Sequence, residues 1–214
     1  MADDKAHLAA IIEATRQAKK RRELKNNLVL IFEGEEEVGS VHFEKLVKKA
    51  AFLKKVDCFY VVDMRARDKK TPQIYYGLRG IVVFKLLLTN KKGDLHSGIW
   101  GNLVANPNQI AAEIFAKMKA GKTNKFFVPH FSDNVKKISN KEKKELEKLG
   151  PIDGKIYPSM NINGWLSGYT DEGIKTIIPA NTTVKFSFRL VPEQKGKKIV
   201  KLVSDFIKKE SLKI

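Results

Sequence analysis

Apolar residues recur along this chain with several different spacings, and each spacing predicts one kind of element. Helical spacing predicts amphipathic helices over residues 6–22, 42–53, 107–120 and 195–209, with a short, highly charged helix at 141–149. Unbroken apolar runs at 28–33 and 58–63 are typical of strands that are buried on both faces of a parallel sheet. The first third of the chain is therefore expected to alternate strands and helices around such a sheet.

Downstream of the polar stretch 65–72, the pattern becomes that of an antiparallel sheet covered by helices. A long β run over residues 74–89 is followed by two segments in which apolar and polar residues alternate, 157–166 and 182–191. A long loop is expected at 122–140. With the helices of this region, the element order is β-α-β-β-α, which predicts a ferredoxin-like layer that lacks its last strand.

The expected fold class is thus α/β, with two domains. Residues 1–75 are expected to carry the parallel sheet and residues 76–214 the ferredoxin-like α+β layer, with 211–214 as the stub of its missing strand. A chain of 214 residues with 43% hydrophobic residues is long enough to bury a core in this way. No apolar run approaches the length of a bilayer and the N-terminus is acidic and polar, so a cytoplasmic location is expected.

The formal charge of +17 raises the question of a nucleic-acid partner. Only seven of the 41 basic residues are arginine, whereas proteins that bind bases and phosphates favour arginine forks. Most lysines are expected to be solvated surface, so neither specific nucleic-acid binding nor membrane binding is predicted. A basic nucleic-acid-binding protein is kept as the least favoured alternative. The single cysteine, Cys58, excludes an internal disulfide and is expected to be a packed small side chain.

Three consecutive carboxylates, Glu35 to Glu37, follow the first apolar run, in a turn marked by Gly34 and Gly39. Like charges repel, so such a run indicates that a cation lies nearby. Asp63 closes the second apolar run, and in open α/β sheets ligands gather at the carboxyl ends of the strands. The pattern therefore favours a metal centre over a solvated acidic turn.

Five separated motifs occur in an informative order. They are Glu33-Gly-Glu-Glu-Glu-Val-Gly-Ser40, Tyr76-Gly-Leu-Arg-Gly80, Asp94-Leu-His-Ser-Gly98, Lys175-Thr-Ile-Ile-Pro179 and Phe186-Ser-Phe-Arg-Leu-Val-Pro192. In this order they resemble the co-catalytic zinc metallopeptidase family of cytosolic nonspecific dipeptidase, carnosine dipeptidase, aminoacylase, carboxypeptidase G and succinyl-diaminopimelate desuccinylase. The resemblance implies an internal fragment, with a truncated parallel-sheet zinc-peptidase catalytic domain followed by a ferredoxin-like lid and dimerisation domain.

The resemblance also implies a chemistry, the hydrolysis of the amide bond of dipeptides or N-acyl amino acids at a dinuclear zinc centre. Asp3 stands where the family has a carboxylate that bridges the two ions, although Ala6 replaces the usual glycine of that motif. Glu37 and Asp63 match one further zinc ligand each, and Glu36 matches the general base. Without the resemblance, Asp3 would be interpreted as a helix cap.

Three residues of the lid also match functional positions of the family. His96 resembles a histidine that reaches into the active site of a partner subunit and supports the developing oxyanion, which implies a homodimer through the lid. Arg189 resembles the arginine that binds the substrate carboxylate, and Thr176 resembles a weaker substrate contact. From the residues alone, a surface histidine, an exposed ion pair and a strand filler are the alternatives.

Both histidine ligands of the family lack a counterpart in this chain. His7, His42 and His130 match neither of the family's histidine motifs, so the implied zinc ligands that remain are all carboxylates. Zinc favours nitrogen or sulfur ligands in its tight sites, and weak binding that other divalent ions can share is therefore expected. We expect little or no activity from the chain alone. A non-catalytic dimerisation module, or one half of a split peptidase, is the alternative.

Overall fold

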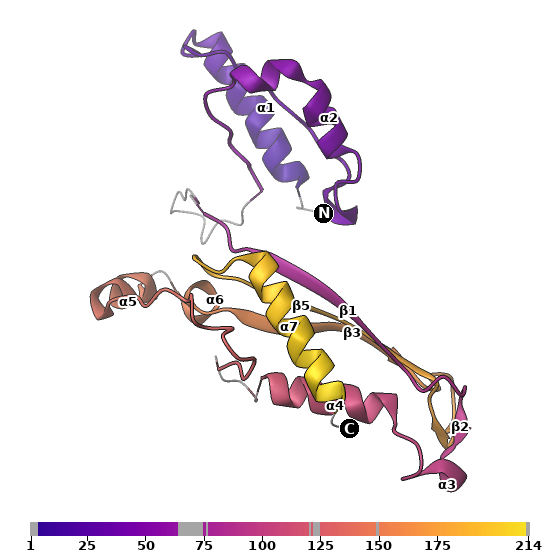
Figure 1. The fold of residues 1–214 in the computed structure, drawn as a ribbon. Helices are drawn as coiled ribbons and strands as arrows, with labels where there is room; N and C mark the ends of the chain where they lie inside the picture. Colours follow the sequence, from indigo (N-terminus) through magenta and orange to yellow (C-terminus); the bar gives the residue numbers. More distant parts are fainter. Residues whose placement is uncertain are drawn as a thin grey trace. The chain divides into compact units, whose positions relative to one another are not determined.

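The computed structural model describes residues 4–63, 75, 77–119, 121, 125–148 and 150–212. The chain folds as two units, Met1–Tyr76 and Gly77–Ile214, and each has its own elements (Figure 1). Helices and strands are both present, which confirms the predicted α/β class. Among the described residues, no helix is both long enough and apolar enough to cross a bilayer.

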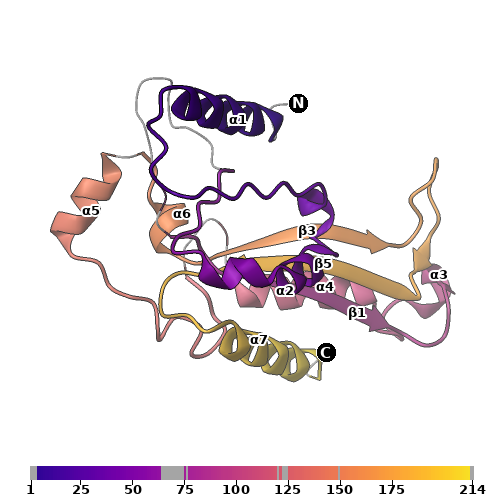
Figure 2. The ribbon, with the colours of Figure 1, turned by 90° about the horizontal axis from the view of Figure 1, so that it is seen from above.

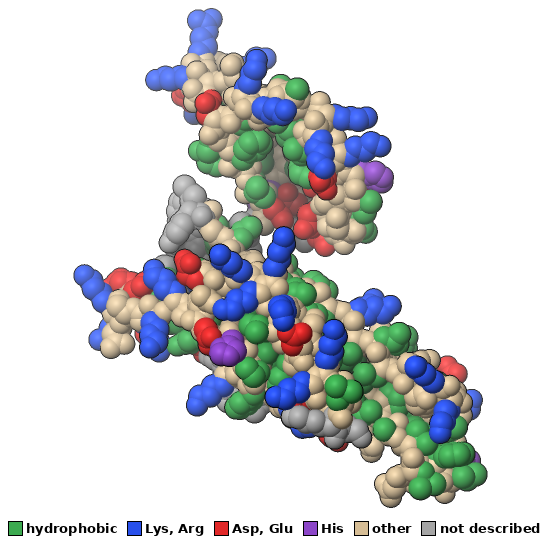
Figure 3. Space-filling view, viewed as in Figure 1, with side chains coloured by type: hydrophobic (Ala, Val, Ile, Leu, Met, Phe, Trp, Pro, Cys, Tyr) green, Lys and Arg blue, Asp and Glu red, His purple; other side chains and the backbone are tan. Residues whose placement is uncertain are grey.

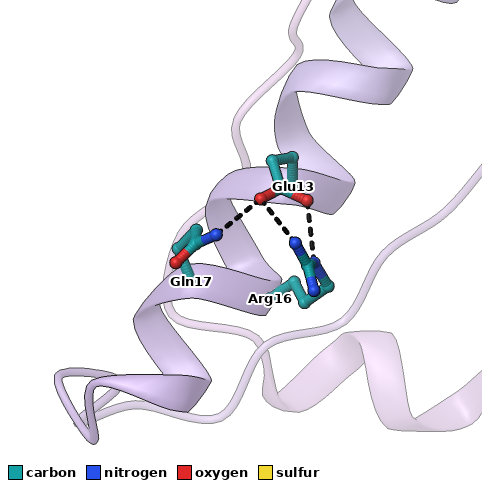
Figure 4. A network of polar contacts seen from close by, with 3 residues as sticks. All are labelled: Glu13, Arg16 and Gln17. Atoms are coloured by element: carbon teal, nitrogen blue, oxygen red, sulfur yellow. Dashed lines mark hydrogen bonds and ion pairs between the residues drawn. The ribbon is translucent and has the colours of Figure 1, made fainter.

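The first unit is helical. Its elements are α1 (Lys5–Lys20), the 3-10 turn η1 (Glu36–Val38), α2 (Phe43–Lys49) and the 3-10 turn η2 (Ala51–Lys55). Helix α1 lies where helical spacing predicted it, and lysines in its last turn suit the negative end of the helix dipole. On its exposed side, Glu13 accepts hydrogen bonds from Arg16 and Gln17 (Figure 4), and these bonds hold the pKa of Glu13 below its ordinary value.

The two apolar runs of the first unit do not form the predicted strands. No described residue of 28–33 or 58–63 belongs to a strand, and Tyr60 and Val61 are both 81% exposed. A strand needs a hydrogen-bonded neighbour, and the described part of this unit contains no ladder to supply one. Cys58 is exposed for the same reason, so its predicted packing is wrong. Of the described residues in this unit, only Leu53 is buried.

The second unit is built on a three-stranded antiparallel sheet. Its strands are β1 (Ile81–Thr89), β3 (Ser159–Ser167) and β5 (Asn181–Arg189), in the order β1-β5-β3. Residue 81 of β1 pairs with residue 189 of β5, and residue 159 of β3 pairs with the same position. Side chains alternate across this sheet, so that every second residue of β5 is buried. Strands β3 and β5 occupy the segments in which alternation predicted them, and β1 lies within the predicted β run.

Two helices cover one face of the sheet, α4 (Pro107–Met118) and α7 (Gly196–Ser211) (Figures 1 and 2). Aromatic rings fill the space between these layers: Phe186 stacks on Phe84 at 4.9 Å between ring centroids and meets Phe115 edge-on at 5.0 Å. Phe186, Phe188, Val184 and Ile114 are fully buried there. The predicted amphipathic helix at 107–120 is confirmed, because Ile114 and Met118 of α4 face the sheet and are inaccessible to solvent.

A small ribbon, which the sequence pattern did not predict, extends the second unit. It pairs β2 (Leu95–His96) with β4 (Ile177–Ile178), and the short helix α3 (Ser97–Trp100) follows β2 directly. The remaining elements are α5 (Asn140–Glu147), which matches the predicted charged helix, and α6 (Asp153–Ile156). Two-residue strands carry too little sequence for any periodicity to be visible.

The order β1-β5-β3 is that of a ferredoxin-like layer without its last strand, as predicted. Strand β1 is an edge strand among the described residues. The predicted strand stub at residues 211–214 is wrong where it is described, because Ser211 ends α7 and Leu212 is the helix C-cap. The predicted β run of residues 74–89 shortens to β1, and its positions 74 and 76 lie outside the described residues.

Candidate functional site

Asp4, His7 and Asp63 converge at one end of the first unit. Each offers one ligand atom, and these atoms lie within 4.8 Å of one another. Asp4 precedes the first turn of α1, and His7 lies one turn further on the same side of that helix. The Asp4 carboxylate contacts the His7 imidazole and makes no capping hydrogen bond to the helix backbone. Two carboxylates and an imidazole form a donor set that zinc accepts.

The implied metal ligands are distributed unevenly over the structure. Asp63 belongs to the convergent group, whereas Asp3 lies outside the described residues. Glu37 is an exposed residue of η1 and is not a member of this group. Asp4 and His7 were not identified as ligands in the sequence. The signal that could have found them is the Asp-x-x-His spacing at a helix start, which places both side chains on one face.

Acidic side chains also gather around η1. Gly39 ends this turn with φ at 92°, a left-handed conformation that glycine adopts without strain. The Glu35 carboxylate accepts a hydrogen bond from the backbone N–H of His42 at 3.1 Å and lies 2.9 Å from its Nδ1. These hydrogen bonds hold the pKa of Glu35 below its ordinary value. Glu35 therefore ties the turn to the start of α2, while Glu36 remains exposed to solvent.

Basic side chains show no comparable concentration on the face of the molecule drawn in Figure 3. Lysines and arginines are distributed over the helices and loops of both units, and acidic side chains lie between many of them. Several lysines form exposed ion pairs within one helix, such as Lys48 with Glu44 and Lys201 with Asp205. Such pairs contribute little to stability and indicate ordinary solvated surface.

His96 is exposed at the end of β2, where it is the N-cap of α3. Its Nδ1 accepts a hydrogen bond from the backbone N–H of Gly98 at 3.0 Å. A neutral imidazole that accepts at Nδ1 carries its proton on Nε2. His96 therefore presents an Nε2–H donor to solvent, which is the group that an oxyanion requires.

Gly98 lies close enough to His96 to control the position of its ring. A Cβ at Gly98 would lie 2.9 Å from His96 Cε1 and 3.1 Å from Nδ1, so replacing Gly98 with alanine should displace the imidazole. We expect the Gly98→Ala variant to keep the fold, because only the His96 side chain must shift to make room. His96 should, however, no longer hold a single tautomer. Two-bond proton–nitrogen NMR of the imidazole measures the tautomer directly. Gly154→Ala is the control, since its Cβ meets nothing within 4 Å. An unchanged His96 spectrum in Gly98→Ala would contradict this role of the glycine.

The ribbon brings His96 and Thr176 together. His96 pairs with Ile177, and the Thr176 carbonyl accepts a hydrogen bond from the backbone N–H of Ser97 at 2.9 Å. Asp94 anchors the ribbon, because its carboxylate accepts from the backbone N–H of Ala180 at 2.7 Å. Asp94 is the first residue of the motif Asp94-Leu-His-Ser-Gly98, but only the structure shows that it positions the ribbon.

Arg189 lies elsewhere in the second unit. It is the exposed last residue of β5, whereas the ribbon connects to the first residue of that strand, Asn181. The nine residues of β5 span about 27 Å at about 3.4 Å per residue. Within one chain, the structure therefore does not bring Arg189 together with His96 and Thr176.

Comparison with known protein families shows which family this chain belongs to. A family model described as the peptidase dimerisation domain matches residues 76–214. The chain belongs to the M20 metallopeptidase family. A second model, described as peptidase family M28, matches residues 1–128. The resemblance to metallopeptidases inferred from the five motifs is thereby confirmed.

Relatives of this M20 family chain include a curated protein and two solved structures. The Cys-Gly metallodipeptidase DUG1 of Candida albicans is 31% identical over 90% of this chain and 44% of its own length. The M20 family metallo-carboxypeptidase Sso-CP2 from Sulfolobus solfataricus matches at 30% identity with a TM-score of 0.80, over 97% of this chain and 52% of its own. The dipeptidase Dug1p from Saccharomyces cerevisiae matches at 29% identity with a TM-score of 0.81, over 99% and 50%. The chain thus spans about half the length of these relatives.

Proposed function

We propose that this chain takes part in the hydrolysis of the amide bond of dipeptides or N-acyl amino acids at a dinuclear zinc centre. The observation that carries the proposal is the convergence of Asp4, His7 and Asp63 within 4.8 Å. The chain's relatives include a Cys-Gly metallodipeptidase and a metallo-carboxypeptidase, and they support both the metal and the substrate class. The whole reaction is a property that we propose for the complete enzyme rather than for this chain alone.

The donor set supports the binding of one ion. Asp4 and Asp63 supply carboxylate oxygens and His7 supplies an imidazole nitrogen, and this mixture matches zinc better than oxygen ligands alone. A second ion would require Asp3 as the bridging carboxylate and Glu37 as a ligand, as the family resemblance implies. The described residues contain one such convergent group, so we expect only weak activity from the isolated chain.

Each proposed side chain has a chemical task. Asp4, His7 and Asp63 would hold zinc, which would polarise the scissile carbonyl and lower the pKa of a water molecule. Glu36 takes the proton of the attacking water and later passes it to the leaving amine. The Nε2–H of His96 donates to the oxyanion, and this donor is oriented before the substrate arrives because Gly98 holds the ring. Arg189 binds the substrate carboxylate through its guanidinium fork, and Thr176 adds a weaker contact.

The separation of His96 from Arg189 supports a homodimer. His96 lies in the ribbon that leads into the first residue of β5, whereas Arg189 is the last residue of that strand, which is about 27 Å long. Both side chains therefore cannot contact one dipeptide from the same chain. A dimer in which His96 reaches the substrate of its partner resolves this conflict. The match of residues 76–214 to a dimerisation domain supports the same arrangement.

The test is a turnover assay of the full chain with Cys-Gly and added zinc. We expect a low, metal-dependent rate that falls by about 100-fold or more in Glu36→Gln, because general-base catalysis contributes that much. Glu44→Gln is the matched control, since Glu44 is an exposed carboxylate of α2 whose ion pair contributes little. Equal rates in the two variants would contradict the role of Glu36.

A non-catalytic dimerisation module is the second candidate. The observation that favours it is the distribution of the core, because the buried hydrophobic residues of the described chain lie in the second unit, with Leu53 as the exception. The turnover assay separates the candidates. Absence of hydrolysis at full metal occupancy would favour the module over the enzyme.

A further inference from the structure

Arg79 belongs to the motif Tyr76-Gly-Leu-Arg-Gly80, to which the proposed function assigns no task. It lies two residues before β1, whose first residue, Ile81, pairs with Arg189. The pairing continues beyond the strand end, because the Gly80 carbonyl accepts a hydrogen bond from the backbone N–H of Leu190 at 2.7 Å. Arg79 therefore lies at the same corner of the sheet as Arg189.

Gly80 keeps the two backbones close at this corner. A Cβ at Gly80 would lie 3.4 Å from the Cβ of Leu190, a side chain that is only 3% exposed. This is ordinary van der Waals contact, so Gly80 packs directly against the buried Leu190 side chain. The backbone hydrogen bond from Leu190 to Gly80 thus keeps Arg79 at the corner where Arg189 lies.

The guanidinium of Arg79 has an unsatisfied group. Its Nη1 is buried and has no hydrogen-bond partner. Burial lowers the pKa of Arg79, and the positive charge of Arg189 lowers it further. Neither arginine forms a salt bridge with a carboxylate of the described residues. A buried donor without a partner and a pair of like charges are both unfavourable, and an anion between them would satisfy both.

We propose that Arg79 and Arg189 together form a two-guanidinium site for a small carboxylate, with Arg79 as a further residue that determines substrate specificity. The inference rests on the proposed role of Arg189 and extends it to a second arginine. Two planar forks can engage both oxygens of one carboxylate, which a single exposed arginine does only weakly in water. The expected ligands are amino acids or peptides with a free carboxylate. The corresponding neutral amides should not bind, because they carry no negative charge.

The test is a direct binding measurement that needs neither metal nor turnover. N-acetylglycine is titrated into the full chain, and the arginine side-chain Nε–Hε signals and backbone amides are followed by NMR. We expect Arg79→Gln to raise the dissociation constant by about 10- to 100-fold, the loss typical of a hydrogen bond to a charged group. Arg79→Lys should restore the charge but little of the affinity, because lysine lacks the fork.

Two controls separate this site from general charge. Lys85→Gln removes a cation from β1 opposite Lys185. Position 85 is four residues, or about 14 Å along the strand, from Ile81 at the arginine corner, so the substitution should change the affinity less than twofold. N-acetylglycinamide, which has no carboxylate, should not bind. The proposal is overturned if Arg79→Gln behaves like Lys85→Gln, or if wild type does not bind N-acetylglycine. If Arg189→Gln weakens the binding of N-acetylglycine and Arg79→Gln does not, the role of Arg79 is overturned and that of Arg189 remains. The zinc-affinity and turnover assays test the proposed function independently of this site.

Discussion

Asp63→Asn is expected to lower the zinc affinity of the chain by roughly 100-fold or more. Substitution of residues that merely support a ligand costs 10- to 100-fold, so loss of a ligand should cost at least as much. Asp63 is one of three side chains whose ligand atoms lie within 4.8 Å, and a neutral amide oxygen is a much weaker zinc ligand than a carboxylate. Competition with a chromophoric chelator measures this affinity directly.

Asp57→Asn is the matched control for this measurement. Asp57 is an exposed carboxylate of the same segment and is not a member of the convergent group, so its loss should leave the zinc affinity within about twofold. His7→Gln should weaken binding to an extent comparable to Asp63→Asn, since it removes the nitrogen donor. Equal affinities in Asp57→Asn and Asp63→Asn would show that Asp63 is not a ligand.

Phe186→Ala is expected to destabilise the second unit by about 3–5 kcal/mol, the usual cost of removing a buried phenylalanine. Phe186 is fully buried, stacks on Phe84 and meets Phe115 edge-on, so that few neighbouring groups can move into the cavity. Urea unfolding followed by tryptophan fluorescence measures the loss. Both tryptophans of the chain, Trp100 and Trp165, lie in the second unit, so the signal reports this unit alone.

Val83→Ala is the control for the core substitution. Val83 lies on the opposite, open face of the same sheet and is 67% exposed, so its truncation should cost less than about 1 kcal/mol. Similar unfolding midpoints for Phe186→Ala and Val83→Ala would contradict the assignment of the core. The zinc affinity serves as a second readout, because neither substitution touches a ligand.

The elements of the second unit could be predicted because each has a local pattern that the tertiary structure satisfies. Helix α4 begins at Pro107, its apolar residues recur at helical spacing, and the same residues are buried against the sheet. In β5, the alternation of apolar and polar residues matches the two faces of a sheet that is covered on one side. Local propensity and tertiary packing agree here, and the prediction is confirmed.

The first unit shows where this reasoning fails. The runs 28–33 and 58–63 are apolar enough for buried strands, yet they form no strand in the described residues. Apolar character predicts that a segment prefers burial, whereas a strand also requires a neighbour that completes its hydrogen bonds. The sequence of the segment alone does not show whether such a neighbour is present.

The sequence by itself determined the α/β class, the family, and the residue types that the chemistry needs. Motifs and periodicities are local, so Glu36, His96 and Arg189 could be proposed as site residues from their own segments. Only the tertiary structure decided which of these side chains meet. It joined Asp4 and His7 to Asp63, paired His96 with Ile177 next to Thr176, and brought Arg79 to the corner of the sheet where β5 ends at Arg189. Such proximity depends on strand register and chain reversal, which arise from packing between distant segments rather than from any one of them.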